Sequence, residues 1–143
     1  MKNNKKLNKS YSNWSTYDNY QYKGLIGWLM KYDHKELEVK IPKKKYSKVL
    51  EIGPGPHPHL SYIKHDYDKY FILEKEKNLI KNYKKIKDKR IVVKNYKTDK
   101  LPFNNNYFDR IIMSHVLEHI NFPETFIFEA MSKLKKGGIL SIA

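Results

Sequence analysis

Apolar and polar positions alternate along this chain in short blocks that predict a parallel sheet. Five runs rich in Val, Ile, Leu, Phe and Tyr predict strands at residues 48–52, 70–74, 90–95, 108–114 and 139–143. Helical patterns fill most of the intervals between them. Because strands that alternate with helices form a parallel sheet with helices on its faces, we expect an α/β, doubly wound, Rossmann-like fold.

A helix is predicted before the first strand. Mostly apolar side chains recur at three- and four-residue steps between Trp14 and Tyr32. We expect this helical cap to pack on the core, although its aromatic stripe would also suit a lid over a substrate.

The last helix has the clearest boundaries. Pro123 suits its first turn, and Gly137 and Gly138 would end it. Its apolar side chains are Phe126, Ile127, Ala130, Met131 and Leu134.

Composition divides the 143 residues into three parts. Residues 1–13 predict a disordered basic tail, residues 14–45 a helical cap with a basic linker, and residues 46–143 a single cofactor-binding domain. The chain has no cysteine, which excludes disulfides and cysteine nucleophiles and suits a cytoplasmic protein. No apolar run approaches the ~18 residues of a membrane span, so we expect a soluble protein.

The formal net charge of +14 raises the question of nucleic-acid binding. Lysines are scattered over much of the chain and accompany many Asn, Tyr and Ile residues, a pattern typical of a lysine- and asparagine-biased composition. Solvated helix faces are the commoner meaning of such charge runs, and a nucleic-acid partner stays open only through the charge.

Residues 48–55 (KVLEIGPG) predict a buried strand that leads into a nucleotide-type loop. Glycine at Gly53 and Gly55 allows a tight turn and close approach of a ligand. Glu74 ends the next predicted strand, where a carboxylate can accept hydrogen bonds from ribose hydroxyls. The two strand ends together predict a nucleoside cofactor.

The loop favours S-adenosylmethionine over a dinucleotide. A dinucleotide loop has a third glycine at the place that Pro58 occupies. The carboxylate of Glu51 would repel a pyrophosphate but suits a cofactor with a cationic end.

From about residue 46 to residue 143 the chain resembles the class I S-adenosylmethionine-dependent methyltransferases, in particular the small-molecule, type 11-like domain. The matching segments are 49–55, Glu74, 101–103, 108–109, 115–120 and 134–140. The resemblance implies that Glu51, Gly53, Pro54 and Gly55 line the methionine end of the cofactor and that Glu74 holds its ribose. It also implies that Ser114 and His115 lie near the reacting sulfonium.

The chain departs from the family pattern in three places. The acid that often reads the adenine amino group is replaced by Lys97, and Thr98 or Asp99 would have to substitute for it. The loop continues with His57 and Pro58, a variant associated with methyltransferases that act on sugars. The family sheet continues past the fifth strand, so we expect a truncated domain whose open edge a second chain or a missing C-terminal segment covers.

Histidines are the candidate bases. Transfer to a hydroxyl requires a group that removes its proton, and His115 and His119 have a suitable unperturbed pKa. Residues 115–119 also spell the H-x-x-E-H signature of inverted zinc peptidases, but a strand leads directly into them and little chain remains for a third ligand, so we expect no metal.

The sequence thus predicts S-adenosylmethionine-dependent methyl transfer to a small-molecule or sugar-like acceptor. One alternative is an inactive or partner-dependent cofactor-binding remnant. The other is an RNA methyltransferase, although the aromatic motif with which ribosomal RNA adenine dimethylases stack the target base is absent after the fourth strand, where residues 114–117 read SHVL.

Overall fold

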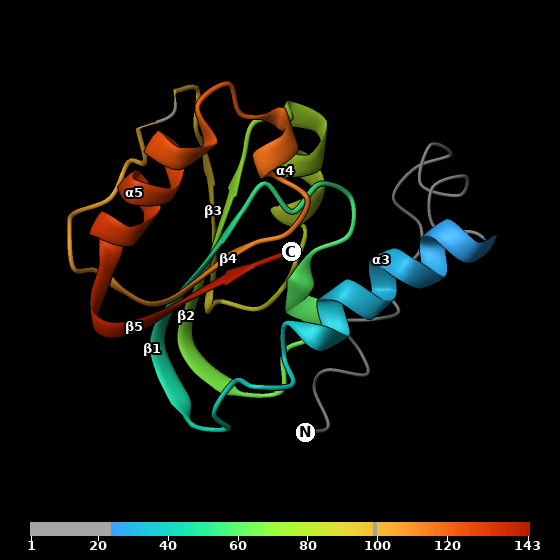
Figure 1. Cartoon of the computed structure of the whole chain (residues 1–143), viewed down its shortest axis with the longest axis horizontal. Coiled ribbons are helices and arrows are strands. Elements are labelled where there is room, and N and C mark those ends of the chain that lie inside the picture. The colour runs from blue at the N-terminus through green and yellow to red at the C-terminus, as the bar shows by residue number, and fades with distance from the viewer. Residues whose placement is uncertain (1–23, 99) are drawn as a thin grey trace.

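The structure is a computed structural model that describes residues 24–98 and 100–143. Five parallel strands form one sheet in the order β3-β2-β1-β4-β5 (Figure 1). The strands are β1 (Lys45–Ile52), β2 (Asp66–Glu74), β3 (Ile91–Asn95), β4 (Phe108–Met113) and β5 (Leu134–Ile142). The α-helices are α3 (Gly24–Glu36), α4 (Lys77–Tyr83) and α5 (Pro123–Lys133), and two short 3-10 helices are η1 (His59–Ser61) and η2 (Leu117–His119).

The predicted α/β fold is confirmed, and the first four predicted strands lie within four residues of the observed ones. The strand order reverses next to β1, so the tips of β1 and β4 flank the switch point where ligands bind in such sheets. The predicted tail at residues 1–13 and the first part of the cap, 14–23, lie outside the described residues.

Helix α5 covers one face of the sheet. Phe126 and Ala130 of this helix are buried and pack against Leu50, Ile111 and Met113 of the central strands. Burial of a side chain as large as Phe, Leu, Ile or Met contributes about 1.5–3 kcal/mol. This apolar cluster fixes β1 and β4, the two strands whose tips flank the switch point.

The other face is covered by α4, by η1 and by the turn after α3. Tyr83 of α4 and Leu60 of η1 pack on Val49, Tyr70 and Ile72 of the sheet. In Figure 1, α3 and α4 lie on the opposite side of the sheet from α5.

The predicted start of the fifth strand is wrong. The helix α5 ends at Lys133, and β5 begins at Leu134 instead of at residue 139. Leu134 pairs with Phe108 and Ile139 with Arg110, so the intervening residues form an irregularity rather than a helix end. Gly137, with a φ of 76°, absorbs this irregularity.

The prediction that the aromatic stripe of the cap packs on the core is also wrong for its described aromatic side chains. Trp28 and Tyr32 are 60% and 48% exposed and stack on each other with ring centroids 5.8 Å apart. The buried side chains in and after α3 are His34 and Glu38. Met131, one of the apolar side chains of α5, is 51% exposed.

Candidate functional site

The loop after β1 is built around two glycines in the left-handed region. Gly53 and Gly55 both have a φ of 58°, which side chains with a Cβ rarely adopt. A Cβ on Gly53 would lie 3.1 Å from Val116, whereas a Cβ on Gly55 would meet nothing within 4 Å. Gly53 therefore packs against the segment after β4, and Gly55, next to Pro54, faces open space where a ligand could approach.

Glu74 fastens this loop to the tip of β2. Its carboxylate accepts hydrogen bonds from the backbone N–H groups of Gly55 at 3.1 Å, Lys75 at 2.7 Å and Glu76 at 3.0 Å. A carboxylate has about four acceptor positions, so one remains for a further donor. A pair of ribose hydroxyls would have to displace one of the three backbone bonds.

Glu51 holds the loop from inside the sheet. Its buried carboxylate accepts hydrogen bonds from the backbone N–H of His59 and, at 2.6 Å, from the hydroxyl of Tyr70. Burial raises the pKa of Glu51, and burial together with the Glu51 charge raises the pKa of Tyr70 well above its usual value. In this structure Glu51 shapes the loop and spends its acceptors on the protein itself.

The tip of β4 carries polar atoms without hydrogen-bond partners. The buried Oγ of Ser114 has no partner among the described residues, and neither does Nε2 of His115. Backbone bonds with Ala143 hold this segment, and His115 has a φ of 55°. Buried polar atoms are normally paired, so the Ser114 hydroxyl is free to bind a ligand.

Two acids flank the His115 ring. Nε2 lies 3.6 Å from Asp33 of α3, and Nδ1 lies 4.0 Å from Glu118. His119 lies in η2 and is exposed. The H-x-x-E-H segment is therefore not α-helical, and no group of three potential metal ligands occurs among the described residues.

The segment expected to bind the adenine ring is exposed where the structure describes it. Thr98 is exposed and donates its hydroxyl to the carbonyl of Lys100 at 3.4 Å, and Lys97 is exposed as well. Asp99 lies outside the described residues.

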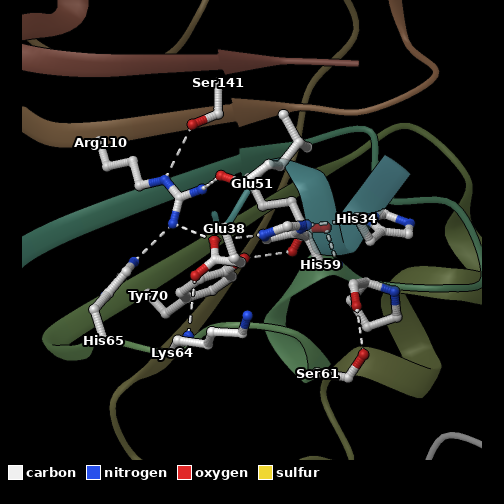
Figure 2. Close-up of polar contacts among 12 residues, drawn as sticks. His34, Glu38, Glu51, His59, Ser61, Lys64, His65, Tyr70, Arg110 and Ser141 are labelled. Atoms are coloured by element: carbon white, nitrogen blue, oxygen red, sulfur yellow. Dashed lines mark hydrogen bonds and ion pairs between the residues drawn. The ribbon is translucent and has the colours of Figure 1, made fainter. Parts of the chain in front are cut away.

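A buried ion pair that the sequence did not predict joins the end of the cap to the sheet. Glu38 follows α3 and contacts the guanidinium of Arg110 in β4 at 2.5 Å, both side chains being fully buried (Figure 2). Arg110 also donates to Ser141 at 3.2 Å, contacts His65 at 2.9 Å and donates to the Leu37 carbonyl at 3.3 Å. Each of the three guanidinium nitrogens of Arg110 thus has a polar partner.

Two histidines extend this network toward the β4 tip. Nε2 of His59 lies 2.8 Å from Glu38, and Nδ1 of His59 lies 3.0 Å from Nδ1 of His34. The His34 ring packs 6.3 Å from that of His115, centroid to centroid. Glu38, His59 and His34 thus connect Arg110 to the tip of β4.

The charges of the network follow from these contacts. Burial alone would raise the pKa of Glu38, but the hydrogen bond with His59 and the charge of Arg110 outweigh it and lower the pKa to about 2. Burial, reinforced by His59 and His115, lowers the pKa of His34 to about 3. Since ionised Glu38 can only accept, Nε2 of His59 carries a proton, and one further proton is shared between the two Nδ1 atoms.

The predicted cofactor residues fall into two groups. Gly53, Gly55 and Glu74 meet at the tips of β1 and β2, and Val116 brings the Ser114–His115 segment against them. The Thr98 hydroxyl instead donates to the carbonyl of Lys100. The open space at Gly55 and the unpartnered Ser114 hydroxyl fit a nucleoside cofactor with a polar amino-acid end.

Comparison with known proteins places the chain in a family. Residues 50–142 match the family model described as "Methyltransferase domain", and the chain belongs to this family. S-adenosylmethionine is the cofactor that this family and fold specify. No curated protein matches the sequence of the chain.

Solved structures share the fold. A methyltransferase of Haloferax volcanii in complex with the Trm112 activator superposes with a TM-score of 0.70 at 18% identity, over 81% of this chain and 54% of that chain. A Thermotoga maritima S-adenosylmethionine-dependent methyltransferase, described as a possible histamine N-methyltransferase, superposes with a TM-score of 0.67 at 20% identity. The match covers 97% of this chain and 58% of that chain. The [4+2]-cyclase SpnF superposes with a TM-score of 0.64 at 20% identity, over 82% of this chain and 44% of that chain.

At this level of identity these likenesses show the fold alone. The cyclase among them illustrates that one fold can support different reactions. The chain spans about half the length of several of these structures. None of the described helices combines the length and apolarity needed to cross a membrane.

Proposed function

We propose that this chain binds S-adenosylmethionine at the tips of β1, β2 and β4 and supports methyl transfer to a hydroxyl of a small-molecule or sugar-like acceptor. The observation that carries the proposal is the bond from the Gly55 N–H to Glu74. This bond joins the left-handed glycine loop to the strand end from which a carboxylate can reach a ribose.

Each cofactor residue has a defined task. Gly53 and Gly55 keep the loop clear of side chains, and Pro54 stiffens the turn between them. Glu74 accepts a ribose hydroxyl at its remaining position, and Ser114 offers its hydroxyl to the amino-acid end. Thr98 and Asp99 belong to the segment that would border the adenine.

The cofactor supplies a methyl group already activated by a positive sulfur, so the protein chiefly orients the acceptor and excludes water. His115 is the base in this proposal: its Nε2 takes the hydroxyl proton. Asp33 and Glu118 lie beside the ring and would stabilise the imidazolium that forms. His119 is exposed and lies four residues after His115, so we propose it only as the second candidate for the base.

A methyl-transfer assay tests the acceptor. The chain is incubated with labelled S-adenosylmethionine and a panel of hydroxylated sugars and small alcohols, and His115→Asn is compared with His119→Asn. We expect the first variant to lose activity by about 10²-fold or more and the second to keep most of it, as for removal of a general base. Equal activity of all three proteins would contradict the role of His115.

A partner-dependent cofactor-binding module is the second candidate. Among the described residues β5 pairs only with β4, so its other edge is open to an added strand. The Haloferax relative was solved in complex with an activator protein. Cofactor binding without any transfer by the isolated chain would favour this candidate.

A further inference from the structure

Positive charge is concentrated in one segment of the fold. Residues 75–100 contain eleven basic and three acidic side chains, a net charge of +8 out of the +14 of the whole chain. Residues 101–143 contain four of each and are neutral. A compositional bias alone would raise the charge throughout. We call the basic side chains of the segment the basic edge: Lys75, Lys77, Lys81, Lys84, Lys85, Lys87, Lys89, Arg90, Lys94, Lys97 and Lys100.

The basic edge occupies one border of the sheet. It comprises α4, the outermost strand β3 and the connections that flank them, and α4 and β3 lie side by side in Figure 1. Lys75 lies over the ring of Tyr96 at 4.8 Å, and Lys94 lies over the ring of Phe103 at 4.9 Å. Lys75 lies in the connection between β2 and α4, and Lys94 lies in β3 itself, so these contacts hold both lysines at the border of the sheet.

The lysines of the helix point away from the core. Lys77 and Lys81 of α4 and Lys84, the C-cap of this helix, follow one another at steps of four and three residues, which places them on one side of the helix, and all three are exposed. Ile80 and Tyr83 of the same helix are buried. The exposed side of α4 is therefore charged, and its apolar side is already used by the core.

The acids that the structure describes at this surface already have partners of their own. Asp88 of the segment and Asp66 of β2 both pair with Arg90. Glu76 is the N-cap of α4 and accepts from Asn78. Lys77, Lys81 and Lys84 pair with no carboxylate among the described residues.

We propose that the basic edge binds the phosphate backbone of a nucleic acid. Its side chains are lysines with a single arginine, and lysine contacts phosphate as a point charge without the forked geometry that reads guanine. Binding through such contacts is driven by counterion release and does not depend on base sequence. A membrane surface fits less well, because α4 has no exposed apolar side chain to insert.

The basic edge begins at the cofactor site. Lys75 directly follows Glu74, and Asn95 at the end of β3 donates its side-chain amide to the Glu74 carbonyl at 3.0 Å. A nucleic-acid strand bound along the basic edge would run beside the tip of β2. The inference concerns binding only and does not rest on the identity of the methyl acceptor.

Fluorescence anisotropy with a labelled single-stranded RNA of mixed sequence tests the proposal. The variant Lys77→Gln/Lys81→Gln/Lys84→Gln removes three charges from the basic edge. Lys40→Gln/Lys43→Gln/Lys136→Gln removes three charges from exposed positions elsewhere and is the matched control. Both variants and the unaltered chain are titrated between 50 and 200 mM salt, without cofactor.

We expect micromolar binding by the unaltered chain at about 50 mM salt, equal for two unrelated RNA sequences. The basic-edge variant should bind RNA at least about tenfold more weakly. The slope of the logarithm of its binding constant against the logarithm of the salt concentration should become shallower by about 2 units. The affinity of the control variant should change by less than about threefold. Equal weakening by the two variants would overturn the proposal, because it would mean that the total charge rather than this surface is responsible.

No binding to RNA, or tighter binding to polyglutamate or to vesicles with anionic lipid at equal salt, would also overturn it. A separate titration with S-adenosylhomocysteine reports on the cofactor site. Because that readout is independent of RNA, failure of this inference and failure of the proposed function are distinguishable.

Discussion

The two faces of the sheet are stabilised in different ways. Under α5 the buried side chains are apolar, and the rings of Phe71, Phe103 and Phe108 meet edge to face. Under α3 and η1 the buried layer includes Glu38 and Arg110. The first face is held by the apolar area it buries, whereas the second combines an apolar cluster with buried charges that each require a partner. In the part of the cap that the structure describes, buried polar contacts and not the exposed rings of Trp28 and Tyr32 join the cap to the sheet.

The largest effect is expected from breaking the ion pair of the polar face. Glu38→Gln leaves the guanidinium of Arg110 buried without its counter-charge, and we expect the free energy of unfolding in urea to fall by about 3–5 kcal/mol. The double variant Glu38→Leu/Arg110→Met removes both charges and should recover most of that loss. A loss below about 1 kcal/mol for the single variant would contradict a dependence on pairing.

Acid should weaken the polar face before the apolar one. The folded-state pKa of His34, about 3, lies below the unfolded value of 6.5, so its contribution is complete above pH 6.5 and is lost as the pH falls toward 3. Glu38, with a folded pKa of about 2, adds a loss below pH 4.5. Between pH 6.5 and 4.5 the free energy of unfolding should therefore decline with a slope of up to about 1.4 kcal/mol per pH unit.

The variant His34→Asn separates this slope from general acid destabilisation. It removes the titrating imidazole, and urea unfolding at several pH values should show a flatter dependence between pH 6.5 and 4.5. An unchanged slope would assign the acid sensitivity to other groups.

The smallest effect comes from equal apolar deletions on the two faces. Ile111 packs under α5 and Ile112 packs on the opposite face, and both are fully buried. Ile111→Val and Ile112→Val should each cost about 0.5–1.5 kcal/mol, independent of pH. If Ile112→Val lowers the free energy of unfolding several times more than Ile111→Val, the two faces differ in their apolar packing and not in the pairing of buried charges.

Sequence patterns predicted the sheet because buried parallel strands form continuous apolar runs, as in residues 48–52 and 108–114. The start of β5 was not predictable from such a run, because Lys135 at its beginning is held by Asp109 at 2.8 Å and not by apolar burial. The strand thus extends through residues whose pattern is typical of a helix end.

The turn after β1 and its contact with Glu74 were predictable because the two glycines and the acid that ends β2 have a fixed spacing, while cofactor binding by this loop stays a prediction. The buried network was not, because Glu38 and Arg110 are far apart in the sequence and no periodicity links them. One signal was present: Arg110 stands inside an apolar strand, and a charge buried in such a strand requires a partner.

Glu74 offers the most direct test of the proposed cofactor site. Calorimetric titration with S-adenosylhomocysteine would compare the unaltered chain with Glu74→Gln and with Glu76→Gln, an exposed glutamate two residues away that serves as control. We predict micromolar binding that Glu74→Gln weakens by at least about tenfold, or 1.4 kcal/mol, and that Glu76→Gln leaves unchanged. Absence of binding by the folded chain, or equal affinity of all three proteins, would contradict the cofactor site described here.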